Sequence, residues 1–188
     1  MPNTAGVYTN SAFARLDFTQ IDTTADSSDN APASVSVTVL TPPSIKLVKS
    51  CTSPANCMSG GARPGVDLTY TITFTNEGGS AAQNLSIVDI IPVSDSGGAL
   101  VRSTEFKVGS MTFAPGTTGL TIAPAGYRHY SDAVAYPIPL PPWSPSTSYT
   151  PPGGGGTYDA NVTYAAWQLT GNMPAGSSGS VTFTVRIK

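Results

Sequence analysis

Regular alternation over residues 68–76 is the feature that most constrains this chain. Every second position is apolar, and threonine fills the positions between: Leu68, Tyr70, Ile72 and Phe74 alternate with Thr69, Thr71, Thr73 and Thr75. Side chains of a β-strand point alternately to the two faces of its sheet. The order therefore predicts a strand with one buried face and one face of hydroxyl groups in contact with water.

Similar patterns predict further strands at residues 34–40, 45–49, 85–91, 104–113 and 181–187. Clusters of glycine, proline, serine and aspartate separate them, and no segment has the spacing of a crossover helix. Many short strands joined by turns are typical of a sandwich rather than of βαβ units. We therefore expect an all-β chain with an Ig-like Greek-key β-sandwich over residues 44–188. A strand tail at residues 1–43 would complete its own or a neighbouring subunit's sheet.

The segment at about residues 137–156 interrupts this pattern. It is rich in proline and contains a run of four glycines, so it cannot supply a central strand. Trp143 and several tyrosines lie in or near it, and aromatic side chains favour packing over a free linker. We expect an ordered excursion over the surface of the sandwich.

Charge excludes several classes of function. Charged residues make up 11% of the chain, against about 25% in ordinary soluble domains. Nine Lys and Arg stand against eleven Asp and Glu, so the chain lacks the basic surface that binds nucleic acid. No apolar run reaches the roughly 20 residues of a membrane span, and no signal-peptide pattern is present. We expect a soluble chain, or a processed or excised piece of an exported protein, that needs no cofactor.

Four ordered segments of the body carry a resemblance to a known family. They are Ile45-Lys-Leu-Val-Lys49, the stretch from Pro64 to Gly78, Asn84-Leu-Ser-Ile-Val-Asp-Ile-Ile-Pro92, and the stretch from Pro174 to Val185. Their order closely resembles the conserved-repeat family of prokaryotic surface proteins known as domain of unknown function eleven. The resemblance implies an Ig-like module of a large secreted or wall-associated protein. It implies no particular ligand.

The first forty residues resemble the closing strands of the same module. Residues 8–15, 26–30 and 34–39 carry this likeness, although they precede the body, and the body has no closing strands after Ile187. Three outcomes follow. The tail completes its own body, or it is donated to the open sheet of another copy, with Val35, Val37 and Val39 as anchors, or the chain is a piece of a tandem array cut within a repeat.

Three polar side chains are expected on inward-facing positions. Lys49, Asn76 and Asp89 each share a face with apolar neighbours on their strands, and buried polar groups are costly unless they are paired. A desolvated Lys49 amine that attacked the Asn76 carboxamide would form an isopeptide bond and release ammonia, with a protonated Asp89 polarising the carbonyl. The alternatives are a hydrogen-bonded cluster at a strand end, or three residues just beyond the buried zone.

Other candidate sites rest on short patterns. Cys51 and Cys57 close a short loop, and a disulfide is expected in an exported chain, with free thiols in a reducing compartment as the alternative. A weak calcium candidate, the only metal site suggested, combines Asp22, Asp26 and Asp29 with Asn30, although such clusters are usually simple turns. Asn84 and Asn161 begin glycosylation sequons.

These features indicate a protein that is not an enzyme. His129 is the only histidine, and no nucleophile elbow or metal-binding helix accompanies it. The leading interpretation is a structural subunit of an extracellular filament, pilus or surface layer, built from identical subunits through β-strand contacts. The alternative is a cell-surface adhesion module that binds a glycan or protein through loops and aromatic residues of the excursion, namely Tyr127, Tyr130, Tyr136, Trp143 and Tyr149.

Overall fold

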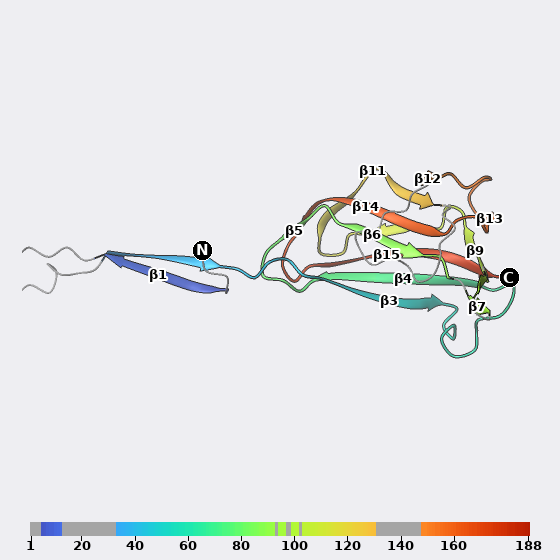
Figure 1. Cartoon of the computed structure of the whole chain (residues 1–188), viewed down its shortest axis with the longest axis horizontal. Coiled ribbons are helices and arrows are strands. Elements are labelled where there is room, and N and C mark those ends of the chain that lie inside the picture. Colours follow the sequence, from blue (N-terminus) through green and yellow to red (C-terminus); the bar gives the residue numbers. More distant parts are fainter. Residues whose placement is uncertain (1–4, 13–32, 93, 97–98, 102, 131–147) are drawn as a thin grey trace, which may run out of the picture. The chain divides into compact units, whose positions relative to one another are not determined.

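The computed structural model of the chain describes residues 5–12, 33–92, 94–96, 99–101, 103–130 and 148–188 (Figure 1). The chain divides into two units, Met1–Pro42 and Pro43–Lys188. The sequence predicts this division one residue later, after Pro43. Throughout the described ranges the regular structure is β-strand and no residue is helical, which agrees with the expected all-β class. Accordingly, no helix in that part of the chain has the length and apolarity needed to cross a bilayer.

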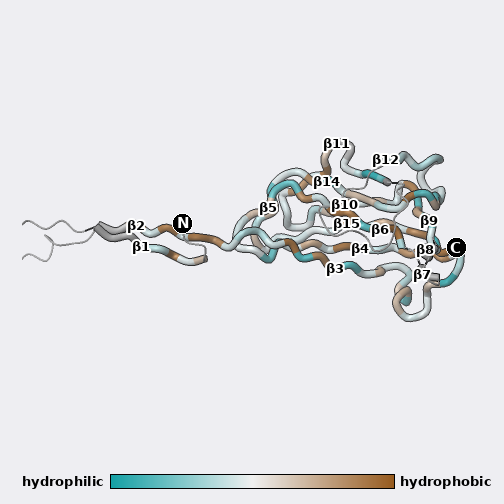
Figure 2. The backbone as a smooth tube through the Cα atoms, in the orientation of Figure 1, coloured by the Kyte–Doolittle hydropathy of each residue, from teal (hydrophilic) through white to brown (hydrophobic). Residues whose placement is uncertain are grey.

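The first unit contains a two-stranded antiparallel ribbon. β1 (Gly6–Ala12) pairs with β2 (Ala33–Val39), from Gly6 opposite Val39 to Ala12 opposite Ala33. The strand expected at residues 34–40 is therefore present, and its partner in this sheet is β1. Figure 2 shows how strongly hydrophobic the C-terminal end of β2 is.

The second unit contains two larger antiparallel sheets. The first has the order β13-β9-β15-β4-β3, with β10 also paired to β15. Its strands are β3 (Ile45–Ser53), β4 (Asp67–Asn76), β9 (Thr104–Lys107), β10 (Thr112–Ala114), β13 (Tyr158–Asp159) and β15 (Ser178–Ile187). The predicted strand at residues 104–113 is thus two strands, because Val108 and Gly109 form a turn between them in which Gly109 has a φ of 78°.

The second sheet has the order β12-β11-β14-β5, with β6 also paired to β14. Its strands are β5 (Ala82–Gln83), β6 (Ser86–Ile90), β11 (Gly119–Tyr130), β12 (Ser148–Tyr149) and β14 (Tyr164–Met173). A further small hairpin joins β7 (Ser94–Ser96) to β8 (Ala99–Val101).

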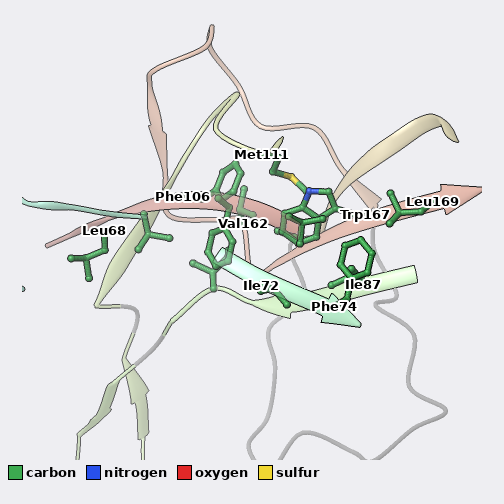
Figure 3. Close-up of a cluster of buried hydrophobic side chains, with 14 of the residues drawn as sticks. Leu68, Ile72, Phe74, Ile87, Phe106, Met111, Val162, Trp167 and Leu169 are labelled. Carbon is green, nitrogen blue, oxygen red and sulfur yellow. The ribbon is translucent and has the colours of Figure 1, made fainter. Parts of the chain in front are cut away.

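The two larger sheets share one hydrophobic core. Alternate residues of β4 and β15 face it from the first sheet, and β6 and β14 face it from the second. Figure 3 shows side chains from both sheets converging there, including Ile72, Phe74, Ile87 and Trp167. The opposite face of β4 carries the threonines, and Thr69 shares a hydrogen bond of 2.9 Å with Thr184 of β15.

Aromatic rings occupy the centre of this core. Trp167 and Phe183 are fully buried, with ring centroids 6.1 Å apart. Phe183 also stacks on Tyr70 at 5.5 Å, and the indole N–H of Trp167 donates a hydrogen bond of 3.0 Å to the carbonyl of Thr112. Edge-to-face and offset ring pairs of this kind add to the free energy gained by burial.

The proline-rich and glycine-rich excursion lies partly outside the described residues. In its described part, β12 pairs with β11 at an edge of the second sheet. Just after the four glycines, β13 pairs with β9 at an edge of the first sheet. Both strands are short edge strands, as expected for a segment that cannot enter the centre of a sheet.

The packing of Phe183 generates a stability prediction. Phe183→Ala should lower the free energy of unfolding by about 3–5 kcal/mol, because it removes a fully buried ring and leaves a cavity between Tyr70 and Trp167. Val48→Ala, at a side chain that is 53% exposed, should change it by less than about 0.5 kcal/mol. Guanidinium unfolding followed by tryptophan fluorescence measures both. Equal effects would contradict this account of the core.

Candidate functional site

Both sheets of the sandwich end on the same side of the molecule. β3 is the last strand of the first sheet there, and no described strand pairs with β6 on the side away from β14. An ion pair between Lys49 of β3 and Asp89 of β6 brings these two edges together. We call the surface formed by the edges of β3 and β6 the open side.

Lys49 and Asp89 meet closely at the open side. The Lys49 Nζ donates to Oδ1 of Asp89 at 2.9 Å and lies 2.7 Å from Oδ2. The same ammonium lies 4.8 Å from the ring centroid of Tyr70 and 5.4 Å from that of Phe183. Aromatic faces attract cations, so the rings hold the ammonium near the carboxylate. The two side chains are 37% and 14% exposed, which makes the pair partly buried.

Burial has the largest influence on the pKa of Asp89. Desolvation raises the pKa of this carboxyl above its usual value, while Lys49 and a backbone hydrogen bond from Ile90 act in the opposite direction. The charged form of a carboxylate that is desolvated in this way depends on a nearby cation for its stability. The pair is therefore a contact between the two sheets that is sensitive to loss of either partner.

The third predicted member of the cluster, Asn76, lies elsewhere. In the register of β3 with β4, Ile45 is opposite Asn76 and Lys49 is opposite Ile72. Four strand residues separate the two positions by roughly 13 Å. The structure therefore brings Lys49 and Asp89 together but leaves Asn76 apart, because the shared facing of these residues does not specify their level along the strands.

Asn76 is fully buried and its carboxamide is occupied by backbone groups. Its Oδ1 accepts hydrogen bonds from the N–H groups of Ser44 and Gly78, at 3.2 and 3.1 Å. Its Nδ2 donates to the carbonyls of Ser80 and Met173, at 2.9 and 3.1 Å. The sequence correctly placed Asn76 inside the protein, but its role is to join the start of β3, the turn after β4 and the end of β14.

Cys51 and Cys57 form the expected disulfide, with an S–S distance of 2.03 Å. Cys57 is buried, and Cys51 packs against the core at the end of β3. The bond is compatible with an oxidising environment outside the cytosol.

The remaining predicted sites show no assembled centre. Asn84 and Asn161, the two sequon asparagines, are both exposed. Asp22, Asp26 and Asp29 lie outside the described residues, as do Tyr136 and Trp143 of the aromatic group. Among the residues that the structure describes, no three His, Cys, Asp or Glu side chains form a metal-binding group.

His129 lies in a half-buried position on β11, with its ring 5.0 Å from that of Phe106 in an edge-to-face contact. Burial lowers the pKa of His129, and the nearby Asp159 opposes this shift. Asp159 itself accepts a hydrogen bond of 2.8 Å from the hydroxyl of Tyr149. Tyr149 of the predicted aromatic group thus has a structural contact, and no nucleophile accompanies the histidine within the contacts described.

Sequence reasoning missed a second charged cluster at the far end of the first sheet. Asp67 accepts hydrogen bonds of 2.7 Å from both Lys107 and the Tyr158 hydroxyl. Arg186 stacks on the Tyr158 ring at 3.7 Å and pairs with Glu105 at 2.7 Å. These residues lie on four different strands, and no spacing in the sequence identifies them as neighbours.

The Lys49–Asp89 pair predicts a difference between two lysines of β3. Lys49→Met should lower the free energy of unfolding by about 1–3 kcal/mol at pH 7, because Asp89 keeps a poorly solvated charge without its cation. Lys46 pairs with Glu77 in an exposed position, so Lys46→Met should cost less than about 0.5 kcal/mol.

The effect of Lys49→Met should also depend on pH. Because the pKa of Asp89 is raised in the folded state, the folded carboxyl takes up a proton before the unfolded one as pH falls. The loss of unfolding free energy caused by Lys49→Met should therefore become smaller as the pH falls from 7 to 4. Urea unfolding of both lysine variants over this pH range measures the loss. A loss that stays constant with pH would show that the unpaired Asp89 carboxylate is not its cause.

Intact mass spectrometry distinguishes the two covalent predictions. The purified chain should be two hydrogens lighter than the sequence mass, because Cys51 and Cys57 are joined. It should not have lost ammonia, because Asn76 lies away from Lys49 and is occupied by four backbone groups. Reduction should restore the two hydrogens. A mass lower by one ammonia would contradict the register of β3.

Comparisons with protein-family models, with curated proteins and with solved structures find no match to this chain. The resemblance to the conserved-repeat family of prokaryotic surface proteins stays a prediction from the sequence.

Proposed function

We propose that this chain is a non-enzymatic structural subunit of an extracellular filament, pilus or surface layer, in which copies associate through β-strand contacts. An Ig-like arrangement of the sandwich belongs to this proposal. The ribbon of β1 and β2 is the observation that carries it, since a two-stranded sheet is at best marginally stable in water unless another surface covers it.

The ribbon has one apolar face. Val35, Val37 and Val39 share a face of β2, where they lie opposite Asn10, Tyr8 and Gly6 of β1, so that Asn10 is the polar residue of this face. Val35 and Val37 are 60% and 57% exposed. The other face carries hydroxyl groups, with Thr9 and Ser36 joined by a hydrogen bond of 2.9 Å, although Val7 also lies there. An amphipathic ribbon of this kind suits addition to another sheet.

Charge and covalent chemistry support the same proposal. The described residues of β1 and β2 include no charged side chain, so close packing of ribbons on neighbouring molecules meets no like-charge repulsion there. The disulfide suits an extracellular location. Neither observation favours turnover of a substrate.

The proposal predicts self-association through the apolar face of the ribbon. The full chain should form oligomers or fibres as its concentration rises, measured by sedimentation velocity and negative-stain electron microscopy. Val37→Asp should raise the concentration needed for association by about tenfold or more, because it places a charge on the contact face. Thr38→Asp, on the hydroxyl face of the same strand, should have a much smaller effect. A chain that stays monomeric at all concentrations would overturn the proposal.

A further inference from the structure

We infer that the open side of the sandwich is the acceptor for the β1–β2 ribbon of a second copy of this chain, with the ribbon paired to the free edge of β6 and its apolar face covering Leu47. This inference rests on the proposed self-association and adds the surface at which it occurs.

Leu47 is the first observation. Alternation along β3 places Leu47 on the same face as Ile45 and Cys51, both of which pack against the core. Leu47 is nevertheless 54% exposed. A leucine on the inward face of its strand remains exposed when the facing sheet does not extend over it. In the part of the chain that the structure describes, β6 is the last strand of the second sheet on this side, so one more strand there would cover Leu47.

The backbone of β6 can accept such a strand. The carbonyl of Leu85 accepts from the N–H of Leu169, and the N–H of Ile91 donates to the carbonyl of Thr163. Residues that bond to the same neighbour recur at every second position of an antiparallel ladder. Ser86 and Val88 therefore direct their backbone groups away from β14, toward the open side. The N–H of Ile90 is used by Asp89.

The edge of β3 is a poorer acceptor than that of β6. β3 carries Lys46 directly before Leu47 and Lys49 two residues after it, and lysines on an edge strand protect it from pairing with other chains. Each of these lysines has its own carboxylate partner, Glu77 and Asp89. Among the described residues, the open side thus offers the unpaired backbone edge of β6 and the inward-facing but exposed Leu47, while both lysines are paired.

The ribbon matches this surface in pattern and chemistry. Its strands of seven residues are long enough to pair along the five residues of β6. With its apolar face turned toward β3, Val37 and Tyr8 approach Leu47, and the hydroxyl face continues the outer surface of the second sheet. Apolar side chains exposed on both partners would then be buried, which is the main source of free energy for association.

The linker favours a second copy over the chain's own ribbon. β2 ends at Val39 and β3 begins at Ile45, with Pro42 and Pro43 between them. A residue that precedes proline is restricted to extended conformations, which here applies to Thr41 and to Pro42. Docking of the ribbon on the β6 edge of its own chain would require the chain to reverse within these few residues before β3 begins, and consecutive prolines disfavour such a reversal.

Engineered disulfides in the full chain test this inference. One variant carries Leu47→Cys with Val37→Cys, and a second carries Leu47→Cys with Tyr8→Cys. Mild oxidation of at least one of them should give a covalent ladder on a non-reducing gel. The control pair is Val48→Cys with Thr38→Cys. It should give no ladder, because both residues lie on the opposite faces of the same strands. The control is matched in accessibility, since Val48 is 53% exposed and Leu47 is 54% exposed.

A second measurement separates the acceptor from the proposed function. Leu47→Asp should weaken self-association by about tenfold or more, whereas Val48→Asp should leave it nearly unchanged, with circular dichroism confirming that both variants are folded. Association that persists in Leu47→Asp without a cysteine ladder would overturn the inference and leave the proposed function standing. A cross-linked monomer would show that the ribbon docks on its own chain. Absence of any association in the unaltered chain would overturn both.

Discussion

The pairing of β4 with β15 is the interaction on which the rest of the sandwich depends. These two strands lie at the centre of the first sheet and pair in register from Thr75 opposite Ser178 to Asp67 opposite Arg186. Their inward-facing residues include the fully buried Phe74 and Phe183, on which the second sheet packs. On the outward face, Thr69 of β4 and Thr184 of β15 bond to one another across the two strands. One alternating pattern thus supplies both the buried and the hydrated surface.

The same strand register determines where polar side chains lie at the margin of this core. Asn76 ends β4 at one end of the sandwich, where three chain segments leave backbone groups that need hydrogen-bond partners, and its carboxamide provides four bonds to them. Lys49 lies four residues further along the neighbouring strand, where the second sheet presents Asp89. Asn76 and the Lys49–Asp89 pair thus each have hydrogen-bond or ionic partners close by, as polar groups that are removed from water require.

An incomplete side is the other consequence of this arrangement. Among the described strands, β3 and β6 are the last of their sheets on this side, yet Leu47 lies on the inward face of β3 and is exposed. Elsewhere in the first sheet, alternation and burial agree: β15 has buried residues at every second position. The exposure of Leu47 on β3 and that of the valines of β2 are the two observations from which we infer a contact between copies.

The sequence by itself determined the all-β class, the alternating faces of β4 and β15, the burial of Asn76 and the pairing of Cys51 with Cys57. Alternation and short loops are local properties that can be read along one strand. Tertiary structure alone decided which residues meet across strands: the separation of Asn76 from Lys49, the cluster around Tyr158, and the partnership of β2 with β1. The physical reason is that facing is set by the period of a single strand, whereas register and partner choice depend on contacts between segments far apart in the chain.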